Sequence, residues 1–340
     1  ECDLQAAHRQ HAFITIWDDH EIANDSWVGG AQNHTPGTEG PWAQRVADGL
    51  KAYYEWMPIR AVDTADLRRN QRSFRFGDLV ELVMLEERLG ARSQQLPATI
   101  PLGNNQFGFT QTGAFADPTR TLLGTTQEAW LYDKLRTTPA RWKLLGQGVM
   151  LSQIKAVGAP NAFGGGVFFN SDAWDGYQPA RNRLYEVIKG DGNHAKVDNV
   201  VVLTGDIHSS WAADLTPDPN NPVVASGGYN ATTGEGSLAV EFVGTSITSP
   251  GFDFDTDNAF ANSLKPANPH FKYINLHRRG YMVVDVTPQR AVGEWYFVDT
   301  VASPSNIETF AVAFEVQQGT NRLAPAAQTP TPANPPQLAP

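Results

Sequence analysis

Two short runs of polar residues in this chain have the composition of a metal-dependent catalytic site. The first follows the apolar residues 12–17 and contains Asp18, Asp19, His20 and Glu21, with Asn24 and Asp25 just beyond. The β-branched run predicts a buried strand, so these side chains would lie at its end. Their oxygen and imidazole donors suit calcium, manganese, iron or zinc, and the absence of thiolates disfavours a structural zinc site.

Such a donor set is typical of metal-assisted hydrolysis. Two cations about 3.5 to 4 Å apart lower the pKa of a bridging water and clamp a phosphoryl group, so no serine or cysteine nucleophile is needed. A helix N-terminus is the alternative interpretation, with Asp18 or Asp19 as the cap, but capping needs only one acid. A glycosidase using either aspartate with Glu21 is a weaker one, because sequence neighbours seldom flank a bond at about 5 to 9.5 Å.

The second run is Gly205, Asp206, Ile207 and His208, which follows residues 197–204, a segment with a continuous valine and leucine run. Alone, Asp206 and His208 predict a ligand pair and a hydrogen-bonded turn about equally well. If the local backbone stays extended, both side chains can converge on one cation. In open α/β sheets the carboxyl ends of the strands form the ligand crevice. Both polar runs would then lie on the same rim.

The elements that must position these residues form an α/β pattern with long loops. Apolar spacing predicts a helix over residues 42–57, stopped by Pro58, another over 127–136 with Thr126 as its N-cap, and a third from Pro179 to Lys189. Residues 104–117 and 158–176 read as loops. Strands are predicted at residues 12–17, 73–76, 79–85, 142–150, 197–204, 237–243, 281–286, 294–298 and 310–316.

Bulk properties restrict the class of protein. The 340 residues, 41% of them hydrophobic, can bury a large core, and the net charge of -10 argues against nucleic acid as a structural partner. No apolar run is long enough to span a bilayer, and no signal segment opens the chain. We expect one domain over residues 1–322 and a Pro/Ala-rich, disordered or extended tail over 323–340. The single cysteine, Cys2, predicts a free thiol.

Taken together, the segments resemble the PhoD-like alkaline phosphatases of the metallophosphoesterase superfamily. The resemblance rests on WDDHE followed by TGDIHSSW, and on RSFRFGDLVELVML, TLLGTTQEAWLYDKL, RWKLLGQGVMLSQ, DAWDGYQPARNRLYEVI and NPHFKYINLHRRGYMVVDVTP. It implies a four-layered α/β/β/α sandwich with the metals at the strand ends. It also implies a phosphoric ester hydrolase acting on monoesters, diesters or both through a metal-activated water or hydroxide.

The resemblance also implies residue roles. WDDHE would take the place of GNHD or GNHE in other metallophosphoesterases, which makes Asp19 a metal ligand and Asp18 a further candidate. His20 would contact the phosphoryl oxygens or protonate the leaving group, and Asn24 would lie beside the metals. GDIH would replace GHxH, giving Asp206 and His208 as ligands. Calcium with iron are the implied ions, and zinc or manganese are alternatives.

Arginines are expected to bind the phosphate, because a guanidinium offers two parallel donors to phosphoryl oxygens. Arg45 and Arg60 match the family pattern, although each is equally compatible with a structural ion pair. His270 is expected to be a structural histidine. Trp174, Asp175 and Tyr177 are expected to organise a loop over the site rather than bind metal.

Part of the family pattern has no counterpart in this sequence. A first metal motif and a cysteine ligand normally precede the segment that opens this chain, so we expect the N-terminal strands to be missing and a further segment of the same protein to be a partner. A catalytically impaired relative that binds phosphate, or acts as a surface protein, is therefore the alternative function. The resemblance implies a periplasmic or extracellular location.

Overall fold

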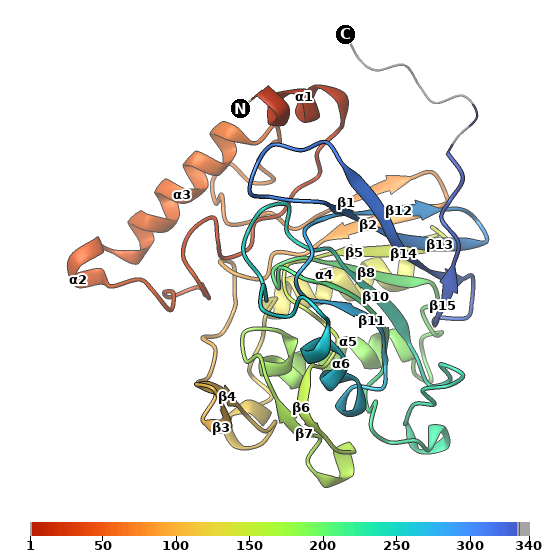
Figure 1. The fold of residues 1–340 in the computed structure, drawn as a ribbon. Coiled ribbons are helices and arrows are strands. Elements are labelled where there is room, and N and C mark those ends of the chain that lie inside the picture. The colour runs from red at the N-terminus through yellow and green to blue at the C-terminus, as the bar shows by residue number, and fades with distance from the viewer. Residues whose placement is uncertain (1, 332, 334–340) are drawn as a thin grey trace.

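Two β-sheets packed face to face organise the chain in the computed structural model, which describes residues 2–331 and 333 (Figure 1). The larger sheet has the strand order β1-β2-β5-β8-β10-β9-β11. Its central strands β2, β5, β8 and β10 are parallel, and β1, β9 and β11 pair antiparallel with their neighbours. The bounds are β1 (Arg72–Phe76), β2 (Val80–Met84), β5 (Trp142–Gly146), β8 (Val200–Thr204), β9 (Ser210–Leu215), β10 (Ala239–Val243) and β11 (Phe271–Asn275).

The smaller sheet is an antiparallel meander of β12 (Gly280–Val286), β13 (Arg290–Val298), β14 (Glu308–Gln317) and β15 (Leu323–Ala326). The strands predicted here are confirmed, but the predicted tail begins as a strand. β15 pairs with β14, and Leu323 is buried between the sheets. The folded part therefore extends beyond residue 322. Residues 332 and 334–340 of the predicted tail lie outside the described part.

Each face of the larger sheet buries an apolar layer. Between the sheets, Trp142 and Phe242 pack with Trp295 and Phe314 of the smaller sheet. The other face packs against α4 (Gly124–Thr137), α5 (Gln178–Lys189) and α6 (Ala259–Leu264), of which α5 and α6 are seen below the sheets in Figure 1. The predicted α/β sandwich is confirmed, and its layers are the helices, the larger sheet and the smaller sheet, in that order. Residues 2–331 and 333 contain no helix packed on the outer face of the smaller sheet.

The helix predictions hold with one shifted start. α5 begins with Pro179 in its first turn, as predicted. α4 begins at Gly124, before the predicted cap Thr126, because Thr121 Oγ1 accepts a hydrogen bond from the Gly124 N–H at 2.8 Å. The predicted loops also contain short elements: 3-10 helices at Gly113–Ala116, Asn161–Phe163 and Trp174–Tyr177, and hairpin strands β4 (Gln106–Gly108), paired with β3 (Ile100–Gly103), and β7 (Gly166–Phe168), paired with β6 (Lys155–Gly158).

The prediction of a strand at residues 12–17 is wrong. These residues have no regular secondary structure and run along α3 (Trp42–Trp56), the long helix that stands apart from α4 to α6 in Figure 1. Trp17 packs with Val46, Leu50 and Tyr53 of that helix. These three positions form one apolar stripe of α3, so the partner of the apolar run is a helix rather than a neighbouring strand.

The remaining helices are short. α1 (Cys2–Gln10) buries none of its residues, and α2 (Pro36–Glu39) precedes α3. Cys2 is exposed and forms no disulfide. No helix in the described part of the chain is long and apolar enough to cross a membrane.

Candidate metal centre

The first polar run forms a tight loop beside α3. The backbone N–H groups of Ile22 and Ala23 both donate to the Asp19 carbonyl, at 2.8 Å each. The Asp19 carboxylate in turn accepts the Asp25 N–H at 2.7 Å, and Glu21 Oε2 accepts the Asp18 N–H at 2.9 Å. The segment is a series of turns, so the alternative of a helix N-terminus is not observed. These bonds direct the side chains of Asp18 and Asp19 inward.

The second polar run follows β8 and has unusual backbone geometry. Asp206 and His208 adopt φ values of +62° and +55°, in the left-handed region that residues other than glycine seldom enter. The expected extended backbone is therefore not observed here. His208 Nδ1 lies 2.6 Å from the carbonyl oxygen of Pro250. Strained backbone of this kind persists only where surrounding contacts hold it, and it is often found at functional sites.

The two runs meet at the carboxyl ends of the parallel strands, as predicted. Asp18, Asp19, His20 and Asp206 each place a potential ligand atom within 4.8 Å of the others, and a second such group joins Asp19 to Asp25 and Asp172. Asp19 belongs to both groups. The His208 ring lies beside that of His20, with ring centroids 5.0 Å apart. We call Asp18, Asp19, Asp25, Asp172 and Asp206 the acidic cluster.

Arg88 lies at the middle of the acidic cluster and is fully buried. Its Nε donates to Asp18, and its Nη1 lies 2.7 and 2.9 Å from the Asp172 carboxylate oxygens. Its Nη2 lies 3.5 Å from Asp206 and 3.9 Å from Asp19, without a hydrogen bond. Arg92 donates to the same Asp172. The two guanidinium groups partly balance the five carboxylates.

This crowding shifts the acid pKa values in opposite directions. Burial would raise the pKa of Asp18 and of Asp19, but Arg88 holds that of Asp18 below its usual value, and a hydrogen bond from His20 does the same for Asp19. Burial and the Asp18 charge raise the pKa of Asp206 well above its usual range. The ionised form of Asp206 is therefore disfavoured beside the Asp18 charge.

The hydrogen bond to Asp19 also raises the pKa of the His20 imidazole. Burial and the neighbouring Asp172 raise the pKa of Asp25 to about 6. Acids that cannot all ionise together are typical of functional sites, where a cation removes the repulsion.

Gly148, after β5, leaves room for Asp18. A Cβ atom at this position would lie 2.6 Å from Asp18 Oδ1, so a side chain there would displace the carboxylate. Glu87 fixes the Gly148 backbone, because its Oε2 accepts the N–H groups of Gly148 and Val149 at 3.0 and 3.2 Å. Burial raises the pKa of Glu87 to about 8.

The donor set fits a metal ion. Asp18 Oδ2 is buried without a hydrogen-bond donor among the described residues, and Asp18 belongs to the first group of potential ligands. Carboxylate oxygens with an imidazole are ligands for calcium, manganese, iron and zinc, and two groups sharing Asp19 can hold two ions. Arg88 already supplies one positive charge, which reduces the charge that bound ions must balance.

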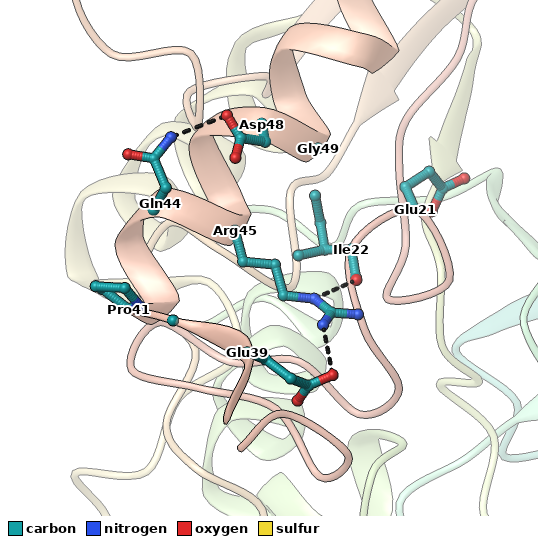
Figure 2. Close-up of a pocket in the computed structure, with 9 residues that line it drawn as sticks. Glu21, Ile22, Glu39, Pro41, Gln44, Arg45, Asp48 and Gly49 are labelled. Atoms are coloured by element: carbon teal, nitrogen blue, oxygen red, sulfur yellow. Dashed lines mark hydrogen bonds and ion pairs between the residues drawn. The ribbon is translucent and has the colours of Figure 1, made fainter. Parts of the chain in front are cut away.

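Arg45 lies next to this loop, in a pocket of about 310 Å³ between the loop and the start of α3 (Figure 2). Its Nε donates to the Ile22 carbonyl at 3.0 Å, and its Nη1 lies 3.2 Å from Glu39. Glu21 and Asp48 also line the pocket. Three carboxylates around one guanidinium make the pocket unfavourable for a phosphate anion.

The other predicted residues are placed less centrally. The Asn24 side-chain amide donates to Gln32 at 2.5 Å. Arg60 is exposed and lies beyond the C-terminal end of α3, so it is not brought to the acidic cluster. The structure thus unites Asp18, Asp19, His20 and Asp206, places His208 beside them, and leaves Arg45, Arg60 and Asn24 outside.

Comparison with known proteins decides the family. The model of the PhoD-like phosphatase family matches residues 1–295. The chain belongs to the PhoD-like phosphatase family. The resemblance inferred from WDDHE and TGDIHSSW is thereby confirmed.

Two relatives extend the comparison. Alkaline phosphatase D of Bacillus subtilis is 29% identical over 331 residues, which cover 97% of this chain and 51% of that protein. A solved structure of PhoD superposes with a TM-score of 0.73 at 29% identity, covering 94% of this chain and 55% of that one. The chain therefore spans about half the length of the relatives that it matches.

Several other residues singled out in the sequence of this PhoD-like chain make structural contacts. His270 is buried and lies 3.0 Å from the Gln153 carbonyl, and burial lowers its pKa to about 3. The Trp174 indole donates to Glu87 at 3.0 Å, and Asp175 pairs with Arg181 at 2.6 Å. Tyr177 donates to the Ser93 carbonyl. These contacts hold the loop that carries Asp172.

The sequence prediction missed Arg88, Arg92 and Asp172. Both arginines lie in the run EERLGAR that follows β2 and Leu85, and this run leaves the same end of the sheet as the segment of Asp206 after β8. A charged run after a strand was the available signal, and the same argument would have found it. Asp172 lies in a long loop and gave no comparable signal.

Proposed function

We propose that this chain hydrolyses phosphoesters at the acidic cluster with bound metal ions. The observation that carries the proposal is the meeting of Asp18, Asp19 and His20 with Asp206 at the carboxyl ends of the parallel strands. Membership of the PhoD-like phosphatase family and the name of the Bacillus subtilis relative, alkaline phosphatase D, support a phosphoric ester hydrolase.

The proposed ligands are Asp18, Asp19, Asp206 and His208. When bound, the ions polarise the phosphoryl oxygens and lower the pKa of a water. A cation held by these residues would favour the ionised form of the Asp206 carboxylate, whose pKa is raised by burial and by the Asp18 charge. Calcium with iron follow from the family resemblance, and manganese or zinc would suit the same donors.

His20 is the proposed group on the substrate side. Its Nδ1 lies 2.7 Å from Asp19, and half of its side chain is exposed, so Nε2 is available to a substrate. The bond to Asp19 keeps the imidazole protonated to higher pH, which suits donation to a phosphoryl oxygen or to the leaving group. Asn24 of the same loop remains a predicted contact for the phosphoester, whereas the carboxylates around Arg45 and the exposed position of Arg60 count against the predicted role of these two arginines.

A second function is favoured by one observation. Arg88 already occupies the middle of the acidic cluster, as a cation would, which is the arrangement expected of a catalytically impaired relative that binds phosphate without turnover. The retained Asp19, His20, Asp206 and His208 favour the enzyme. Monoester or diester preference and an exported location are proposals from the family alone.

Turnover by the 340-residue chain separates the two functions. The chain would be stripped of metal, reloaded with calcium and iron, manganese or zinc, and given p-nitrophenyl phosphate and bis(p-nitrophenyl) phosphate. The enzyme predicts turnover only after reloading, and the ratio of the two rates gives the ester preference. Calorimetric binding of inorganic phosphate without turnover under any metal condition would instead establish the impaired relative.

A further inference from the structure

A backbone carbonyl determines which ring nitrogen of His208 carries the proton. The Pro250 carbonyl oxygen, 2.6 Å from Nδ1, can only accept a hydrogen bond, so Nδ1 carries the proton. In the neutral ring this leaves the Nε2 lone pair free, which is the form that binds a metal. A metal-ligating histidine normally has such a partner for its second nitrogen, and loss of that partner weakens the site.

Pro250 lies in an exposed loop that needs an anchor. Residues 249–253 follow β10 and have no regular secondary structure. The side chain of Arg279, only 6% exposed, reaches this loop from the segment before β12. Its Nε donates to the Ser249 carbonyl at 2.6 Å, and its Nη2 pairs with Asp253. Arg279 therefore holds the loop on both sides of Pro250, at Ser249 and at Asp253.

Gly251 completes the connection between Arg279 and His208. A Cβ atom there would lie 2.7 Å from the His208 carbonyl oxygen and 3.1 Å from Arg279 Nη2. Gly251 therefore lies close to both the His208 backbone and the Arg279 guanidinium. The His208 backbone also has a positive φ of +55°, so it relies on its neighbours to stay in place.

We propose that Arg279 is a positioning residue for His208. By holding the Ser249 carbonyl and the loop that follows, Arg279 keeps the Pro250 carbonyl where it fixes the Nδ1–H tautomer and leaves Nε2 for a cation. The role of Nε2 rests on the proposed function, but the tautomer itself does not. Among the described residues, the Arg279 side chain bonds Ser249, His277 and Asp253 and no member of the acidic cluster.

Arg278 is a matched control on the adjacent position. Its Nη2 donates to the Val298 carbonyl at 3.2 Å, and its guanidinium lies 5.7 Å from the centre of the Phe297 ring. Its side chain has no recorded bond to residues 249–253 in the described part of the chain. The variant Arg278→Gln therefore shows what the loss of a positive charge in this segment does when the loop 249–253 keeps its contacts.

The test uses the metal-free 340-residue chain with the variants Arg279→Gln, Arg279→Lys, Arg278→Gln and Gly251→Ala. Imidazole ¹⁵N NMR, assigned with His208→Gln, reports the tautomer, and calorimetry with Mn²⁺ reports cation affinity. We expect Arg279→Gln to give averaged His208 nitrogen shifts and about tenfold weaker Mn²⁺ binding. Arg279→Lys should restore part of both, and Arg278→Gln should change neither.

Unchanged nitrogen shifts in Arg279→Gln, or an equal effect of Arg278→Gln, would overturn the proposal. If Arg279→Gln does not fold, Gly251→Ala takes its place, because the added methyl displaces the same loop, and unchanged shifts in it would be equally contrary. If the wild type does not bind Mn²⁺, only the proposed function is contradicted. The nitrogen shifts of His208 would still decide whether Arg279 positions it.

Discussion

The carboxylates of the acidic cluster differ in the positively charged groups that lie next to them. Asp18 is ionised by its contact with Arg88, Asp19 by His20, and Asp172 lies between two arginines. The nearest guanidinium nitrogen to Asp206 is Arg88 Nη2 at 3.5 Å, and burial with the Asp18 charge raises the pKa of Asp206 well above its usual range. Buried charges need partners of opposite sign, so a cation beside Asp206 would complete the balance.

The proposed role of His20 predicts a dependence on the leaving group. Replacing His20 with Gln should lower kcat about 100-fold or more for an alkyl phosphate, whose alkoxide must be protonated as it leaves. The loss should be much smaller for p-nitrophenyl phosphate, because p-nitrophenolate leaves without a proton. Steady-state kinetics on both esters measure the difference, with the exposed His194→Gln as control. Equal losses on both esters would assign His20 to phosphoryl contact instead.

Gly148 predicts a steric effect on Asp18. Gly148→Ala should weaken Mn²⁺ binding about tenfold, and the crowding should cost about 1 to 3 kcal/mol of unfolding free energy. Gly205→Ala is the control, because a Cβ there meets no atom within 4 Å. Calorimetry and urea unfolding measure the two quantities. Equal Mn²⁺ affinity in the two variants would show that Asp18 is not a ligand.

At the scale of elements, α3 rather than a strand positions the first polar run. Residues 12–17 have the β-branched composition of a strand, but their apolar side chains pack on the stripe of α3 that contains Val46, Leu50 and Tyr53. Sequence pattern indicates that such a run is buried but does not identify its partner. The turn after Trp17 is then set by hydrogen bonds within the loop.

The anchoring of this loop to α3 gives a prediction for Arg45. Arg45→Met removes the donor to the Ile22 carbonyl, so we expect a loss of about 1 kcal/mol of unfolding free energy and a lower kcat. The inhibition constant of inorganic phosphate should not change. Gln44→Met, from the same pocket, is the control. A weaker inhibition by phosphate in step with KM would show that Arg45 binds substrate, as the sequence predicted.

Prediction from sequence worked best where a local pattern determines structure. The continuous apolar run of β8 and the stripe of α3 were recognisable, and both polar runs do reach the same rim, although the first run follows an irregular segment and not the predicted strand. The left-handed backbone of Asp206 and His208 was not predictable, because it is imposed by the packing of other loops. The contacts of Arg88 and Asp172, 84 residues apart, depend on that same packing.

For the whole molecule, His270 links stability to pH. Its folded pKa of about 3 lies below the ordinary value of 6.5, so its contribution is complete above pH 6.5 and is lost as pH falls toward 3. Between pH 7 and pH 5 this residue should account for about 2 kcal/mol of unfolding free energy. Urea unfolding at both values should show a smaller loss for His270→Gln and an unchanged one for His194→Gln. A wild-type pH dependence retained by His270→Gln would contradict the buried neutral imidazole.

The proposed metal site lies at the carboxyl end of β8, and each end of that strand carries an aspartate that can be replaced by asparagine. Asp206 follows it within the acidic cluster, whereas Asp198 precedes it and pairs with Lys196 at 2.8 Å. The decisive measurement is metal-dependent turnover of p-nitrophenyl phosphate by the wild type, Asp206→Asn and Asp198→Asn. We expect Asp206→Asn to lose turnover about 10- to 100-fold or more at equal metal concentration and Asp198→Asn to match the wild type. Metal-dependent turnover that is unchanged in Asp206→Asn would contradict the proposed metal site.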